Sequence, residues 1–129
     1  MKNKVAFLIL RISIGMVFLI FGIGKFKNDI WVETIKAMDF FLKLPWNVNI
    51  SVYLIGGLEI LTGVSLVLGL FTRFFAVCAV AQLSGILILL KFGETRDIGL
   101  LAAALYIAVT GNETWGIDLL WKKRKRSAR

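Results

Sequence analysis

The feature that most constrains the fold is a series of long apolar runs. The first reads VAFLILRISIGMVFLIFGI, from Val5 to Ile23, and contains a single charge, Arg11. Two further runs cover 50–71 and 74–90, and the only charged residue within them, apart from Arg73 between them, is Glu59. A helix rises 1.5 Å per residue, so runs of about seventeen to twenty-two residues can cross a ~30 Å hydrocarbon core. Each run predicts a membrane-spanning helix.

Composition supports a membrane protein with one domain. Of the 129 residues, 58% are hydrophobic, and mean hydropathy is +0.81. Soluble domains contain roughly 45–50% apolar residues, and a chain this short could not hide such an excess from water. The first run could also be a signal peptide, with Lys2 and Lys4 at its start. However, it is long, has a charge at its middle and is followed by no small-residue cleavage site, so we expect a retained span.

A mixed segment separates the first two runs. Trp31, Ile35, Met38 and Leu42 recur at helical spacing, Asn28 is a candidate N-cap, and Pro45 ends the pattern. This pattern predicts a short amphipathic helix, either lying at the membrane interface or packing as a lid over the bundle.

A fourth run, 97–111, is short unless the segment WGIDLLW continues it after a break at Gly111. The expected fold is therefore all-α: an integral membrane four-helix bundle with spans at about 5–24, 50–71, 74–90 and 97–111 or longer. Residues 1–121 form the membrane domain, and residues 122–129 form a basic tail.

Lys and Arg in the loops predict the orientation. The side that holds both termini and the turn at Arg73 carries nine basic residues, against six on the other side, where five acids offset them. The positive-inside rule then places both termini in the cytoplasm of a cell whose inner (plasma) membrane holds the protein. The tail KKRKRSAR is better explained by anionic lipid than by nucleic acid, which we do not expect as a partner.

The chain has no histidine and one cysteine, Cys78. Histidine-ligated haem, di-iron and copper sites are therefore not expected, nor is any other metal site, and one thiol cannot form an internal redox disulfide. Redox chemistry would need an organic cofactor or a partner subunit.

Arg11 and Glu59 are the most informative residues, because a charge at mid-membrane costs about 2.5–3.5 kcal/mol and must find a partner. The helical rise places Arg11 ~9 Å and Glu59 ~18 Å from the cytoplasmic ends of their runs, a gap that a guanidinium and a carboxylate can bridge. We expect Glu59 to pair with Arg11, with Lys25 as the second candidate. The pair either fixes helix register or forms a polar centre that binds a ligand head group or relays a proton. The remaining possibility is that Arg11 reaches toward the cytoplasm while Glu59 is protonated and alone.

Several short motifs occur in an order that resembles the DoxX family of small bacterial and archaeal membrane proteins. They are Arg11, the sequence GIGK ending at Lys25, Glu59 four residues before Gly63, LGLFTR ending at Arg73, and AAAL followed by Gly111, Trp115 and Asp118. The resemblance implies a four-helix membrane bundle and a link to quinone-dependent redox, because the family shares its name and ancestry with the small subunits of archaeal thiosulfate:quinone oxidoreductase. The redox-active cysteine pairs of some four-span relatives are absent here.

The residues proposed from the resemblance and from the charges fall into two groups. The ligand-binding candidates are Arg11, Lys25, Glu59, Arg96 and Asp97; a cytoplasmic-face polar cluster comprises Thr72, Arg73 and Asp118, with Asp118 able to pair with Arg73 or Arg11. We expect a DoxX-type subunit or accessory of a membrane oxidoreductase that binds quinone or another lipid-like ligand, with no covalent cofactor. The alternatives are a non-catalytic scaffold for larger membrane or redox partners and, with less support, a small carrier or channel that would need to form a homo-oligomer.

Overall fold

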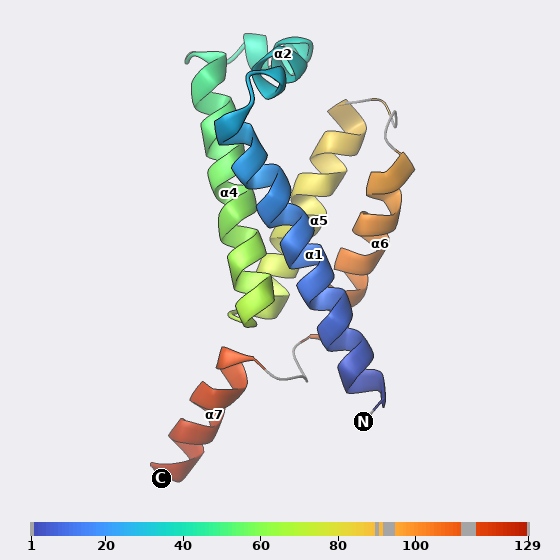
Figure 1. The fold of residues 1–129 in the computed structure, drawn as a ribbon, viewed down its shortest axis with the longest axis vertical. Coiled ribbons are helices and arrows are strands. Elements are labelled where there is room, and N and C mark those ends of the chain that lie inside the picture. Colours follow the sequence, from blue (N-terminus) through green and yellow to red (C-terminus); the bar gives the residue numbers. More distant parts are fainter. Residues whose placement is uncertain (1, 90, 92–94, 112–115, 129) are drawn as a thin grey trace.

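The fold is described from a computed structural model, in which residues 2–89, 91, 95–111 and 116–128 are described. Within these ranges the chain is all-helical. The elements are α1 (Lys2–Lys27), α2 (Ile30–Lys36), α3 (Asp39–Leu42), α4 (Val48–Leu68), α5 (Thr72–Leu89), α6 (Thr95–Thr110) and α7 (Ile117–Ser127). Helix α1 lies diagonally across the bundle formed with α4, α5 and α6, while α2 covers one end and α7 leaves the other (Figure 1). Both termini lie at the α7 end.

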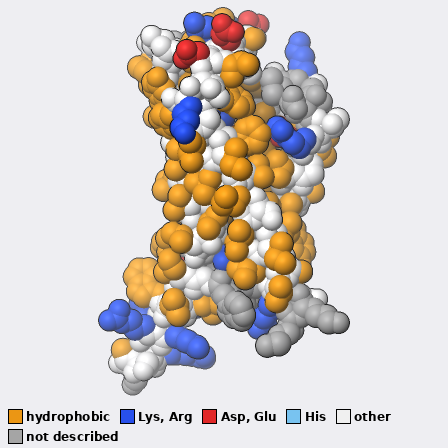
Figure 2. Space-filling view, in the orientation of Figure 1, with side chains coloured by type: hydrophobic (Ala, Val, Ile, Leu, Met, Phe, Trp, Pro, Cys, Tyr) orange, Lys and Arg blue, Asp and Glu red, His pale blue; other side chains and the backbone are white. Residues whose placement is uncertain are grey.

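Three helices, α1, α4 and α5, are long and apolar enough to cross a membrane. Helix α6 has 16 residues, or about 24 Å at 1.5 Å per residue, which falls short of a ~30 Å core. Figure 2 shows hydrophobic side chains over most of the middle of this face, acidic side chains at the α2 end and Lys and Arg over α7. The three spans are thus confirmed as apolar helices, whereas the fourth remains a prediction.

Glycines hold α1 and α4 together in an antiparallel pair. A Cβ at Gly15 would lie 2.9 Å from the carbonyl oxygen of Gly63, and one at Gly22 would lie 2.9 Å from that of Gly56. Such backbone contact is the usual basis of close helix packing in lipid. The residue numbers in both pairs sum to 78, and those of the further contacts Gly15 with Val67 and Gly22 with Ile60 sum to 82, so each residue of α1 lies level with the residue of α4 whose number is about eighty minus its own.

The central core lies between α1, α4, α5 and α6, and it includes Ile14, Phe18, Leu66, Leu83 and Ile107. Between α4 and α5 the Gln82 amide donates a hydrogen bond of 3.0 Å to the Thr62 hydroxyl. Polar contacts of this kind hold helices together where lipid offers no hydrophobic drive.

The segment between the first two spans was expected to form one amphipathic helix, but it forms two short helices. Met38 adopts an extended backbone conformation that separates α2 from α3, and Asp29, not Asn28, precedes α2. Ile35 is buried against Val48 and Val52 of α4, as a lid would be, but Leu42 is 56% exposed. Of the two placements considered for this segment, α2 packs as a lid over the bundle.

Two boundaries at the opposite end also differ from the prediction. Helix α4 ends at Leu68 with Gly69 in the left-handed conformation, so Thr72 and Arg73 form the first turn of α5 and not the connection. Residues 122–127, predicted as a tail, continue α7. Gly111 has a φ of 75° where α6 ends, and α7 points away from α6 (Figure 1), so α7 does not extend the fourth run. Trp115 lies outside the described residues.

Candidate functional site

The predicted residues are divided between two separate places. Lys25, Glu59, Arg96 and Asp97 line a cavity of about 380 Å³ near the α2 end, which we call the upper cavity. Thr72, Arg73 and Asp118 line a cleft of about 600 Å³ at the α7 end, which we call the lower cleft. Arg11 lines neither. The members of each predicted group thus lie close together in space, except Arg11, which lies apart from the other ligand-binding candidates.

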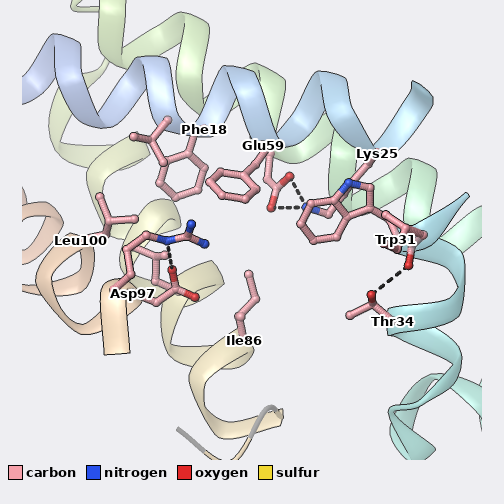
Figure 3. A pocket seen from close by; sticks show the side chains of 13 residues that line it. Phe18, Lys25, Trp31, Thr34, Glu59, Ile86, Asp97 and Leu100 are labelled. Carbon is pink, nitrogen blue, oxygen red and sulfur yellow. Dashed lines mark hydrogen bonds and ion pairs between the residues drawn. The ribbon is translucent and has the colours of Figure 1, made fainter. Parts of the chain in front are cut away.

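Glu59 pairs with Lys25, not with Arg11. The Lys25 ammonium donates to both carboxylate oxygens, at 2.6 Å to Oε2 and 2.9 Å to Oε1 (Figure 3). Both side chains are about 95% buried. Lys25 lies in the last turn of α1, where the helix dipole also favours a positive charge.

The register of α1 and α4 explains why the expected partner was wrong. It places Glu59 level with Phe21, one turn from Lys25 and ten residues, or about 15 Å, from Arg11. The predicted gap of ~9 Å between Arg11 and Glu59 assumed that the start of α1 and the end of α4 lie level on the cytoplasmic side. In fact the N-terminal end of α1 extends beyond the end of α4 (Figure 1).

Aromatic rings and cations line the cavity beside the ion pair. The Lys25 ammonium lies 4.3 Å from the centre of the Trp31 ring, and the Arg96 guanidinium lies 4.8 Å from the centre of the Phe21 ring. Phe21 and Trp31 meet edge to face at 5.8 Å. A cation over an aromatic face is attracted to the ring's negative centre, so these contacts hold the charged groups against the wall.

Arg96 and Asp97 bring the first turn of α6 to the cavity. Asp97 is buried, whereas the Arg96 side chain is 60% exposed, and the two are joined by an ion pair of 3.7 Å (Figure 3). Apart from Thr34, whose hydroxyl donates to the Ile30 carbonyl, the remaining wall is apolar and comes from α1, α2, α5 and α6: Val17, Phe18, Ile30, Leu83, Ile86 and Leu100.

The sequence left Trp31 either at the membrane interface or in a lid over the bundle, and it did not indicate Leu83 or Ile86 as part of the cavity wall. The spacing of Phe18, Phe21 and Lys25, at three and four residues, could have revealed one face of α1. No pattern in α5 marks Leu83 and Ile86 as cavity residues, because α5 is apolar on every side.

Arg11 is buried at the opposite end of α1, with 1% of its surface exposed. Its guanidinium packs against Gly69 and Gly116, where an added Cβ would lie 2.8 Å and 3.2 Å from Nη1. Asp118 attracts it electrostatically, and the backbone N–H of Asp118 donates to the Gly69 carbonyl at 3.4 Å. Of the two partners considered for Asp118, Arg11 is influenced by its charge, and the backbone bond to Gly69 joins the start of α7 to the end of α4.

The side chains that line the upper cavity determine which kinds of ligand it can bind. Among the described residues no group of His, Cys, Asp and Glu could hold a metal ion. The cavity instead offers hydrogen-bond donors on two cations, two carboxylates and flat aromatic faces. Its volume falls within the roughly 300–1,000 Å³ typical of small-molecule sites.

Comparison with known proteins identifies the family. The model of the DoxX family matches residues 6–92, about two thirds of the chain. The chain belongs to the DoxX family. With three apolar helices able to cross a bilayer, this DoxX protein is a multi-pass membrane protein.

A relative from Bacillus subtilis (strain 168) is named "Putative oxidoreductase CatD". It is 28% identical over 132 residues, which cover 96% of the DoxX chain described here and 92% of the relative. No solved structure matches the chain.

Proposed function

We propose that this DoxX protein is a subunit or accessory of a membrane oxidoreductase, and that its upper cavity binds a quinone or another lipid-like molecule with a polar head. The observation that supports the proposal most is the buried Lys25–Glu59 ion pair on the wall of an otherwise apolar cavity. A buried pair costs desolvation energy that a purely structural contact between apolar side chains would not.

The residues present fit a quinone head. Such a head is a flat ring with two carbonyl oxygens, so its site needs apolar faces and hydrogen-bond donors. Trp31 and Phe21 provide faces. An ammonium has three donors, of which Lys25 uses two on Glu59, and the largely exposed Arg96 provides further donors from α6. A bound quinone would supply a two-electron acceptor to the complex.

A partner protein that carries electrons is part of the proposal. A chain with no histidine and one cysteine has few groups for redox chemistry of its own. The name of the Bacillus relative, an oxidoreductase, agrees with a redox setting.

We further propose that α6 completes a four-span bundle in the cell's inner membrane, with both termini in the cytoplasm. Short spans are accommodated by local thinning of the bilayer at a modest energetic cost. The α7 end carries the chain's basic cluster, which agrees with the positive-inside rule. A cysteine introduced at either terminus in a Cys78→Ser background, treated in intact cells with a membrane-impermeant thiol label, tests the topology, and we expect both termini to stay unlabelled.

The test of ligand binding uses the fluorescence of Trp31. Quinones quench tryptophan at short range, so a short-chain benzoquinone added to the detergent-purified protein should quench saturably and raise its melting temperature. In the Trp31→Phe variant the saturable quenching should disappear. In Trp121→Phe, which removes an exposed indole from α7 at the far end, it should persist.

A melting temperature unchanged at saturating quinone, with quenching equal in both variants, would contradict the ligand proposal. If gentle extraction then recovered a stoichiometric larger membrane partner, the scaffold alternative would take its place.

A further inference from the structure

The lower cleft has no role in the proposed function, and its lining is distinctive. It lies where the α4–α5 turn, the end of α6 and α7 come together. Three cations line it: Arg73, Lys122 and Lys125. The acid among its described lining residues is Asp118, whose charge also interacts with the buried Arg11. The cleft therefore presents an excess of positive charge.

Arg73 is held in a fixed position at this cleft. Its Nη2 donates a hydrogen bond of 2.9 Å to the Val109 carbonyl. Its Nε packs so closely on Gly111 that an added Cβ would lie 2.7 Å away. A guanidinium has five N–H donors, and this bond uses one, so several remain to contact an anion.

Exposed aromatic rings surround the same cations. Phe71, Phe74 and Trp121 are 58%, 63% and 58% exposed. The Lys125 ammonium lies 5.9 Å from the centre of the Trp121 ring. Phe71 and Phe74 lie at the end of the spanning helices α4 and α5, the level at which aromatic rings meet lipid head groups.

We propose that the lower cleft is a binding site for an anionic phospholipid. Arg73, Lys122 and Lys125 contact the head-group phosphate, and the acyl chains leave the cleft past Phe71 and Phe74. Positive charge and apolar surface side by side are complementary to a molecule that is anionic at one end and hydrocarbon at the other. The inference requires that α4 and α5 cross the bilayer, and it is independent of what the upper cavity binds.

A matched pair of double variants in α7 tests the site. K122Q/K125Q removes two charges that line the cleft, and K123Q/R126Q removes two from the same helix that do not. Binding of phosphatidylglycerol and of phosphatidylcholine is measured by native mass spectrometry of the detergent-purified full chain. Melting curves, with and without the benzoquinone, verify that each variant is folded.

We expect one phosphatidylglycerol to bind in preference to phosphatidylcholine. At ~1 kcal/mol per lysine near a lipid surface, K122Q/K125Q should weaken that binding about thirtyfold, whereas K123Q/R126Q should change it less than about fivefold. Equal losses in the two variants would overturn the proposal, because they would indicate diffuse attraction to the basic helix. So would equal binding of phosphatidylcholine. Displacement of the lipid by millimolar inorganic phosphate would show a site for a free anion and would also overturn it.

Discussion

The two ends of the α1–α4 pair each hold a buried cation with an acid nearby, yet they are built differently. At one end Lys25 and Glu59 form a tight ion pair beside an open cavity. At the other, Arg11 packs directly against the glycine backbone of Gly69 and Gly116, with Asp118 close by. The comparison teaches that a charge buried in an apolar helix is not by itself a site. What distinguishes the upper end is the space left beside the charge.

The largest effect should come from removing one partner at the upper end. Lys25→Met leaves the Glu59 carboxylate buried without its cation, and we expect a loss of about 3–5 kcal/mol in unfolding free energy. The double variant K25M/E59M should recover most of that loss, because it removes the unpaired charge as well. Unfolding in mixed detergent and denaturant measures both.

If the double variant were as unstable as the single one, the ion pair would not explain the loss. Conversely, a stable double variant that no longer binds the benzoquinone would show that the pair serves the ligand and not the fold.

A smaller effect should distinguish the packed lower end. In Gly69→Ala a methyl group would lie 2.8 Å from Arg11 and Gly116, at a residue whose φ is 71°. We expect it to cost about 1–3 kcal/mol in unfolding free energy. Gly57→Ala, inside α4, meets nothing within 4 Å and should be neutral or stabilising by up to ~1 kcal/mol, from helix propensity.

Thermal unfolding of the two alanine variants side by side measures the difference. Equal melting temperatures would mean that the lower end has room to adjust, which would remove the contrast between the two ends.

The smallest effect on stability should come from Arg96→Gln at the mouth of the upper cavity. The Arg96 side chain is 60% exposed, and exposed ion pairs contribute ~0–1 kcal/mol, so the melting temperature should hardly change. Affinity for the benzoquinone should fall severalfold, since a donor to the ring oxygens is lost. A titration of Trp31 quenching measures it. Unaltered affinity would exclude Arg96 from the site.

Much of this architecture could be predicted from the sequence, because hydrophobic length requires α1, α4 and α5 to span, and charges in such helices must find partners. The resemblance and the charges grouped Lys25, Glu59, Arg96 and Asp97 with Arg11, and the structure places the first four around one cavity and Arg11 apart from them. The sequence favoured Arg11 as the partner of Glu59, because the choice of Lys25 depends on the offset between the helices. Glycine contacts set that offset, and the sequence shows the glycines without showing which ones meet.

The helix boundaries were missed for local reasons. Met38 interrupts the amphipathic segment although its side chain suits a helix, and nothing in its neighbours predicts an extended backbone there. Residues 122–129 were predicted only as a basic tail, whereas 122–127 continue α7, because Lys and Arg are good helix formers.

The glycine contacts between α1 and α4 have a consequence for access. Backbones that meet at Gly15 with Gly63 and at Gly22 with Gly56 leave no gap through which a guest molecule could pass. A guest molecule would therefore reach the Lys25–Glu59 pair from the other side of the cavity, which Ile86 of α5 and the first turn of α6 line. That side offers an apolar side chain at Ile86 and a largely exposed guanidinium at Arg96, which suits a molecule with a hydrocarbon tail and a polar head.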